Sequence, residues 1–162
     1  MTDVTDAPEE GKTYVAANLA VAAASAGDDV ILVDLDLRRP NAHRYLDAPP
    51  VPGIADVIAE HHALDDVLVE IPLPEIASHG GRLRFLPAGR SVPNAGDLVG
   101  SLAIADLIGE LSKKSPQLLI IDTPPLLAVS DATVLSAHTD ATLVVVRADA
   151  ATRASLTRRA AA

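Results

Sequence analysis

The chain has 162 residues, a length typical of one domain, and 49% of them are hydrophobic, which is enough to form a buried core. The net charge of −9 argues against a nonspecific nucleic-acid binder, and the absence of cysteine excludes disulfides and thiolate chemistry. Aromatic residues make up only 2%, so the core must be built from alanine and branched aliphatic residues, as in alanine-rich helices packed on a parallel sheet. No apolar run reaches the roughly 20 residues of a membrane-spanning helix.

Apolar strands alternate with helical segments along the chain. In chain order, the sequence predicts a helix over 13–26, a strand over 30–34, a proline-bounded connection over 40–52, short helices over 53–60 and 63–69, a strand over 82–86, a helix over 94–114, a strand over 118–122, a helix over 131–137, a strand over 142–146 and a helix over 150–162. This alternation predicts an α/β fold with a parallel sheet flanked by helices. Ligands of such sheets bind at the carboxyl ends of the strands.

A phosphate-binding loop is indicated at the start of the first helix by Glu10-Gly11-Lys12-Thr13. Backbone N–H groups at a helix N-terminus point at phosphate oxygens, a lysine here reaches the β- and γ-phosphates, and the hydroxyl binds Mg²⁺. The full pattern has a glycine where this chain has Asp6, so the tripeptide alone is better explained as a solvated turn with a helix cap. The residues expected to contact a nucleotide are Pro8, Glu9, Glu10, Gly11, Lys12, Thr13 and Tyr14.

Strand-end aspartates favour the phosphate interpretation. Asp34, Asp36 and Arg38 alternate at the end of one predicted strand, so they face the same way, and Asp122 ends another. A turn or helix cap explains one of these acids but not the whole set. Because carboxylates beside a phosphate repel it unless a metal or a proton transfer is involved, the set predicts ATP and Mg²⁺ as cofactors. The predicted catalytic residues are Lys12, Asp34 and Asp36, and the predicted metal ligands are Thr13, Asp34 and Asp122.

With these motifs, the chain resembles the bacterial tyrosine kinases of capsule and exopolysaccharide synthesis. The matching segments are 5–13, 15–20, 31–40, 43–46, 53–57, 86–89, 93–94, 97–98, 121–126, 130–132 and 143–147. The resemblance implies a P-loop NTPase fold of the partitioning-ATPase type and ATP-dependent phosphoryl transfer to tyrosine. In it, Lys12 and Thr13 match the nucleotide loop, Asp34 matches the base, Asp34 and Asp36 both support Mg²⁺, and Asp122 matches the third acidic motif.

The resemblance also implies where the protein works and with what. The implied partners are a transmembrane chain-length-determinant protein (a polysaccharide copolymerase) that activates the kinase, a tyrosine-containing protein substrate and further copies of the kinase in a homo-oligomer, but no nucleic acid. The implied location is cytoplasmic, at the inner face of the plasma membrane through the partner.

The sequence departs from the family pattern in its loop and at its ends. Glu9 stands where the family loop has a glycine, and its side chain and charge are expected to weaken ATP binding. We expect a single kinase-like domain over 1–162 that lacks part of the first strand, since only residues 1–5 precede the loop, and that lacks the C-terminal strand and the tyrosine-rich tail. Neither Tyr14 nor Tyr45 belongs to a tyrosine cluster in the sequence.

Two other functions are compatible with the sequence. One is a nucleotide-incompetent interaction module that docks on the membrane copolymerase, which Glu9 and the short ends would explain. The other is a partitioning-type P-loop ATPase. Those ATPases usually carry a second lysine early in the loop, and positions 6–10 contain none.

Overall fold

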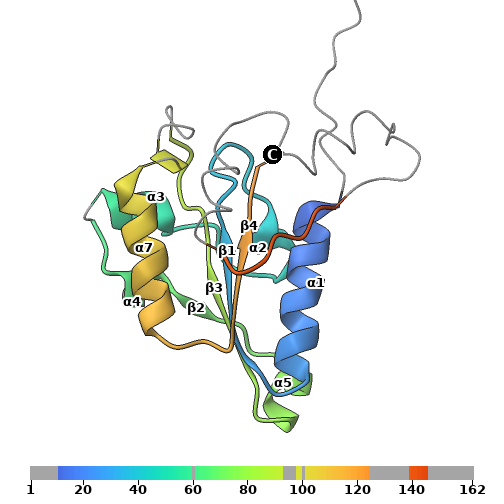
Figure 1. Ribbon diagram of the computed structural model, residues 1–162. Helices are drawn as coiled ribbons and strands as arrows, with labels where there is room; N and C mark the ends of the chain where they lie inside the picture. The colour runs from blue at the N-terminus through green and yellow to red at the C-terminus, as the bar shows by residue number, and fades with distance from the viewer. Residues whose placement is uncertain (1–10, 60, 93–97, 100, 125–138, 146–162) are drawn as a thin grey trace, which may run out of the picture.

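The computed structural model describes residues 11–59, 61–92, 98–99, 101–124 and 139–145 (Figure 1). The predicted helices over 131–137 and 150–162 therefore lie outside the described residues. The elements are α1 (Lys12–Ser25), β1 (Asp29–Asp34), α2 (Ala42–Tyr45), α3 (Ile54–Ile58), α4 (Leu64–Val67), β2 (Val69–Glu70), α5 (Pro74–Ser78), β3 (Arg82–Leu86), α7 (Leu102–Lys113) and β4 (Leu118–Asp122).

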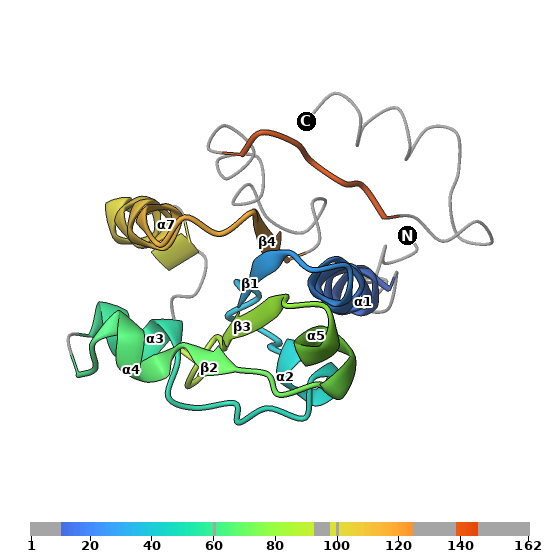
Figure 2. The ribbon, with the colours of Figure 1, turned by 90° about the horizontal axis from the view of Figure 1, so that it is seen from below.

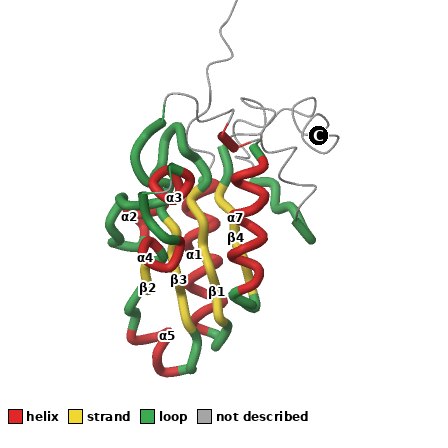
Figure 3. Tube along the Cα trace, turned by 90° about the vertical axis from the view of Figure 1, so that its left-hand side faces the viewer, coloured by secondary structure: helices red, strands yellow, loops and turns green. Residues whose placement is uncertain are grey.

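The four described strands form one sheet in the order β2-β3-β1-β4, visible across the sheet in Figure 3. β1 runs parallel to both β3 and β4, with Leu32 opposite Phe85 on one side and Ile120 on the other. This confirms the predicted α/β fold with a parallel sheet flanked by helices. The two-residue β2 was not predicted, and it runs antiparallel to β3, so the sheet is mixed.

Helices cover both faces of the sheet because alternate residues of the apolar strands point to opposite sides (Figure 2). Ile31 and Val33 pack into a core with α3, α4 and α7, whereas Val30 and Leu32 pack into a second core with α1, α2 and α5. The buried residues of α1 are all alanines, which lets this helix approach the sheet closely. A Cβ at Gly81, just before β3, would overlap the carbonyl oxygen of Ala24 on α1.

Several predicted elements differ from those observed. Residues 142–145 are described and do not form the predicted strand, and Leu143 is 68% exposed. A strand needs a neighbour for its backbone hydrogen bonds, and none of the four described strands pairs with this segment. Within the predicted helix over 94–114, residues 98–99 are helical and α7 covers Leu102–Lys113. Ser101, just before α7, has an extended backbone conformation. The short helices α2 and α5 lie in segments that were not predicted to be helical.

Candidate nucleotide and magnesium site

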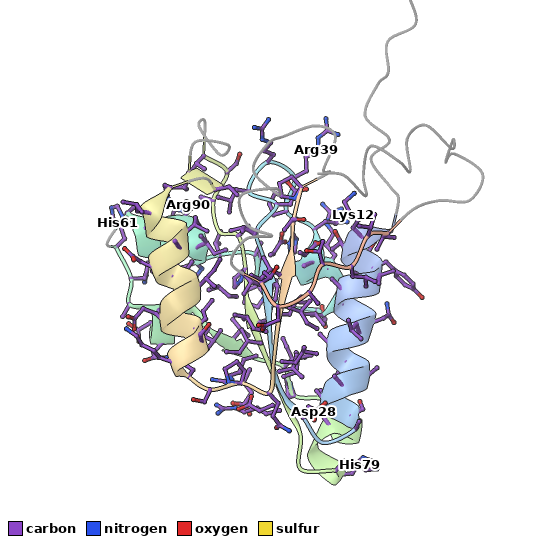
Figure 4. All side chains as sticks on the ribbon, viewed as in Figure 1. Lys12, Asp28, Arg39, His61, His79 and Arg90 are labelled. Carbon is purple, nitrogen blue, oxygen red and sulfur yellow. The ribbon has the colours of Figure 1, made fainter. Side chains whose placement is uncertain are left out.

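The N-terminus of α1 supplies the candidate phosphate site. Gly11 precedes the helix with φ 86°, a left-handed conformation that glycine adopts without strain, and its carbonyl accepts a hydrogen bond from the Val15 amide at 2.8 Å. No side chain among the described residues caps this helix, and the positive end of its dipole lies at Gly11. Figure 4 shows Lys12 at the same end of the molecule as Arg39 and Arg90, with Asp28 and His79 at the opposite end.

Asp34 ends β1 and is completely buried. Its Oδ2 atom accepts hydrogen bonds from the backbone amides of Asn41 at 3.1 Å and Ala42 at 3.0 Å, and its Oδ1 atom accepts one from the Asp36 amide at 3.3 Å. Burial, followed by the nearby charge of Asp122, raises the pKa of Asp34 from 3.8 to about 7. Near neutral pH, Asp34 can therefore exchange a proton.

Asp122 ends β4 and lies directly opposite Asp34 in the sheet register. Its carboxylate accepts a hydrogen bond from the Thr13 side chain, while its Oδ2 atom is buried without a hydrogen-bond partner among the described residues. Burial raises the pKa of Asp122 to about 6, and the Asp36 charge adds to this, while Thr13 and Lys12 act in the opposite direction. A buried, unpartnered carboxylate oxygen beside a hydroxyl is suited to a bound cation.

Asp36 completes the acidic group from the loop after β1. Leu35 and Leu37 are buried in the core on either side of it in the sequence, and Asp36 is half-buried, as the predicted alternation requires. Its Oδ1 atom accepts hydrogen bonds from the amides of Arg38 at 3.3 Å and Arg39 at 3.1 Å, which fixes the turn. Its charge raises the pKa of both Asp34 and Asp122, so the three acids lie close enough to interact.

The donor set fits Mg²⁺ bound together with a nucleotide. Among the described residues, no group of three or more acidic, histidine or cysteine side chains has the geometry to hold a metal ion by itself. Mg²⁺ in nucleotide sites usually keeps several waters and takes one or two carboxylates plus phosphate oxygens. Thr13, Asp122 and Asp34 could supply that protein share, and a divalent cation would offset the charge repulsion of the two buried acids.

The structure thus brings together five residues predicted for the site: Lys12, Thr13, Asp34, Asp36 and Asp122. Pro8, Glu9 and Glu10 lie outside the described residues. Gly11 heads the helix, and Tyr14 is 56% exposed, with its ring edge-on to that of Tyr45 at 5.9 Å between centroids.

Two features of the site were missed from the sequence. The Asn41 and Ala42 amides that bind Asp34 leave no side-chain signal, because any residue type provides a backbone N–H. The two tyrosines are 31 positions apart in the sequence, and only the packing of α2 against α1 brings their rings together.

The buried acids predict an unusual dependence of stability on pH. Asp34 and Asp122 bind protons more tightly in the folded chain than their ordinary pKa of 3.8 allows in the unfolded chain. The folded state therefore holds more protons between these values, and the free energy of unfolding should fall by a few kcal/mol as the pH rises from about 4 to about 7. Urea unfolding followed by circular dichroism across this range measures it.

Saturating Mg²⁺ and nucleotide should reduce this loss of stability, because the ligands favour the ionised acids. An Asp65→Asn variant is the control, since this side chain is 78% exposed and should leave the slope unchanged. A free energy of unfolding that stays constant or rises over the same pH range would contradict the raised pKa values of Asp34 and Asp122.

Residues 8–124 match the sequence profile of the CobQ/CobB/MinD/ParA nucleotide binding domain. The chain belongs to this family of nucleotide-binding domains, as its fold and strand-end acids indicate. No helix within the described ranges has the length and hydrophobicity to span a membrane.

The chain is similar in sequence and in fold to bacterial tyrosine kinases. It is 32% identical over 119 residues to tyrosine-protein kinase ptk of Acinetobacter johnsonii, covering 74% of the chain and 15% of that kinase. It superposes on the kinase domain of Escherichia coli tyrosine kinase ETK with a TM-score of 0.82 and 28% identity, covering 95% of the chain and 57% of that domain. These relatives confirm the predicted resemblance to bacterial tyrosine kinases.

A more distant neighbour carries a ligand in the same fold. The septum site-determining protein MinD of Pyrococcus horikoshii, complexed with Mg-ADP, superposes with a TM-score of 0.56 and 26% identity, covering 80% of the chain and 50% of MinD. Overall, the chain spans between 15% and 47% of the length of the first curated relatives that it matches.

Proposed function

We propose that the chain is the ATP- and Mg²⁺-dependent catalytic domain of a protein-tyrosine kinase that regulates capsule or exopolysaccharide synthesis and export. The observation that carries the proposal is the contact between Thr13, at the N-terminus of α1, and the buried Asp122, which lies opposite the buried Asp34 on the next parallel strand. A hydroxyl beside two strand-end acids is the arrangement that Mg²⁺-nucleotide chemistry requires. The likeness to ETK and to MinD with Mg-ADP supports the same function.

Each residue of the site has a distinct role in this proposal. Lys12 would neutralise the β- and γ-phosphates of ATP, and Thr13 and Asp122 would hold Mg²⁺, which would supply further neutralisation of the phosphate charge. The tyrosine oxygen attacks the γ-phosphorus, the bond from that phosphorus to the departing ADP oxygen breaks, and the phenolic proton passes to Asp34. A pKa of about 7 suits Asp34 to this exchange. Its Oδ1 atom, with a single amide at 3.3 Å, is less occupied than Oδ2 and is the better acceptor.

The proposed partners follow from the resemblance to capsule and exopolysaccharide kinases. They are a transmembrane chain-length-determinant protein that activates the domain, a tyrosine-containing protein substrate and further copies of the kinase. The domain would work at the cytoplasmic face of the plasma membrane, held there by the transmembrane partner. The names of the curated relatives, which are tyrosine-protein kinases, support the acceptor chemistry.

Phosphotyrosine formation tests the function. We expect the purified protein, given γ-labelled ATP, Mg²⁺ and a soluble glutamate–tyrosine copolymer, to transfer label to tyrosine, and to lose this activity with EDTA or in an Asp34→Asn variant. An Asp66→Asn variant, in which an exposed acid is changed, serves as the matched control. Transfer that survives both EDTA and Asp34→Asn would refute the proposed mechanism, provided that circular dichroism shows the variant folded.

The loop residue Glu9 offers a separate test of the nucleotide site. A Glu9→Gly variant is expected to bind an ATP analogue roughly tenfold more tightly, because it removes a negative charge beside the triphosphate and restores backbone freedom. A Glu9→Gln variant removes the charge alone and should give part of this gain. Isothermal titration calorimetry provides the comparison, and equal affinities in all three proteins would show that Glu9 does not weaken the site.

A further inference from the structure

The arginines at the two ends of the sheet differ in their pairing. Toward the amino-terminal ends of the strands, Arg82 contacts Glu70 at 2.9 Å and Arg84 contacts Asp29 at 2.8 Å. Arg39 lies at the opposite end of the molecule, as Figure 4 shows, and it is exposed and forms no ion pair with any of the described residues. The described part of the fold therefore leaves the charge of Arg39 available to a partner.

Arg90 supplies a second exposed charge at the same end (Figure 4). Its side chain is 81% exposed, and its Nε atom lies 3.8 Å from the nearer oxygen of Asp56. An ion pair so long and so exposed to water contributes little. Two arginines, from the loops after β1 and β3, thus present positive charge beside the strand-end acids, although the chain as a whole has a net charge of −9.

The backbone is fixed at both arginines. The Arg39 amide donates a hydrogen bond to the Asp36 Oδ1 atom at 3.1 Å, which closes the turn after β1. Gly89, just before Arg90, has φ 84°, and a Cβ at this position would come within 2.8 Å of the Asp56 Oδ2 atom. Both arginine side chains therefore leave the protein from defined points, which lowers the entropic cost of presenting them to a partner.

The sheet order places these arginines on the acceptor side of the proposed reaction. β1 lies between β4 and β3, and Asp122, with its contact to Thr13, ends β4 on one side of Asp34. Arg90 follows β3 on the other side, and Arg39 lies in the loop directly after β1. If Thr13 and Asp122 hold the nucleotide and metal, an acceptor tyrosine reaches Asp34 from the side of β3, and its flanking residues pass the arginines.

We propose that Arg39 and Arg90 form a docking site for acidic residues that flank the acceptor tyrosine, so that the preferred substrates are acidic polypeptide segments. The proposal rests on the proposed function and names the class of its substrate. Guanidinium groups bind carboxylates through paired hydrogen bonds. The two arginines act as positioning residues, and proton transfer stays with Asp34. A polypeptide is favoured over an anionic membrane because the net charge of −9 opposes approach to a negative surface.

Peptide kinetics test the preference. The probe is a short peptide with one tyrosine between glutamates, and its controls carry glutamine or lysine at the same positions. Since one exposed charge pair contributes a factor of up to about five, we expect kcat/KM to be about tenfold higher for the glutamate peptide than for the glutamine peptide, mainly through KM. Arg39→Gln with Arg90→Gln should abolish this difference. Arg82→Gln, at the opposite end of β3, should keep it, and equal kcat/KM for the three peptides would overturn the proposal.

Binding without reaction separates this proposal from the kinase function. Fluorescein-labelled peptides with phenylalanine in place of tyrosine are titrated with the protein, Mg²⁺ and a nonhydrolysable ATP analogue, and binding is followed by fluorescence anisotropy. We expect the glutamate peptide to bind about tenfold more tightly than the glutamine peptide, and this difference to shrink as salt is added. Such binding by a protein that transfers no phosphate would refute the kinase function and support the docking site. Phosphoryl transfer without any peptide preference would do the reverse.

Charge reversal tests whether the two arginines contact the substrate directly. Arg39→Glu with Arg90→Glu should invert the preference, so that the lysine peptide becomes the better acceptor. A preference for glutamate that persists in this variant would overturn the assignment. So would weaker binding of the ATP analogue with an unchanged peptide preference, which would assign the arginines to the nucleotide. Binding to phosphatidylserine vesicles that needs both arginines, without any peptide preference, would assign them to a membrane surface instead.

Discussion

A Lys12→Ala variant is expected to bind ATP about 100-fold more weakly than the native chain and to lose phosphoryl transfer. Lys12 is the first residue of α1, and its charge is close enough to lower the pKa of Asp122. Its ammonium group would be the main positive side-chain charge on the bound phosphates, and alanine leaves only Mg²⁺ to offset the three acids that face them. Isothermal titration calorimetry with a nonhydrolysable ATP analogue and Mg²⁺ measures the loss.

Two further lysine variants test whether the loss of affinity comes from the charge of Lys12 at this position. Lys113→Ala changes an exposed lysine at the C-terminal end of α7, which pairs with Glu110 at 2.5 Å, and should leave affinity unchanged. Lys12→Arg keeps the charge but changes the shape, so it should retain part of the affinity. Native affinity in Lys12→Ala would show that nucleotide does not bind at the N-terminus of α1.

An Asp122→Asn variant is expected to separate stability from function. Above neutral pH and without ligands, it should stabilise the fold by up to about 3 kcal/mol, because it removes a buried charge whose pKa burial raises from 3.8 to about 6. The amide oxygen can still accept the Thr13 hydrogen bond, and the amide nitrogen replaces the unpartnered Oδ2 atom. The same change removes a predicted Mg²⁺ ligand, so nucleotide binding should no longer depend on Mg²⁺.

Urea unfolding and calorimetry with and without Mg²⁺ measure both effects in one protein. Asp106→Asn, at an exposed position of α7, should alter neither quantity. Loss of stability in Asp122→Asn would mean that the buried carboxylate is compensated in the native chain. Undiminished Mg²⁺ dependence would remove Asp122 from the metal site.

The sequence predicts those parts of the fold that depend on local patterns. The bounds of β3 and β4 agree with the predicted strands, and α1 agrees to within one residue at each end, because continuous apolar runs and an alanine-rich helix carry their own signal. β2 is only two residues long and depends on pairing with β3, where Arg82 also contacts Glu70 at 2.9 Å. α2 has four residues, too few for helical periodicity, and its first amide, that of Ala42, is bound by Asp34, eight positions earlier in the chain.

The site was predictable because parallel strands bring their carboxyl ends to one edge. Asp34 and Asp122 could be assigned to that edge from the sequence, but their direct opposition depends on β1 and β4 being neighbours, which only the sheet order shows. The different hydrogen bonding of the two Asp34 oxygens also depends on the fold, since it is set by the path of the chain from Leu35 to Ala42.

The contact between Tyr14 and Tyr45 gives the protein a built-in optical probe. The chain has two tyrosines and no tryptophan, so its intrinsic ultraviolet fluorescence comes essentially from this one pair. Tyr14 follows Thr13 on α1, and Tyr45 ends α2, whose first amide is bound to Asp34. A ligand that shifts either helix at the acidic site therefore changes the spacing of the two rings, and nucleotide or metal binding can be followed in the native chain without a label.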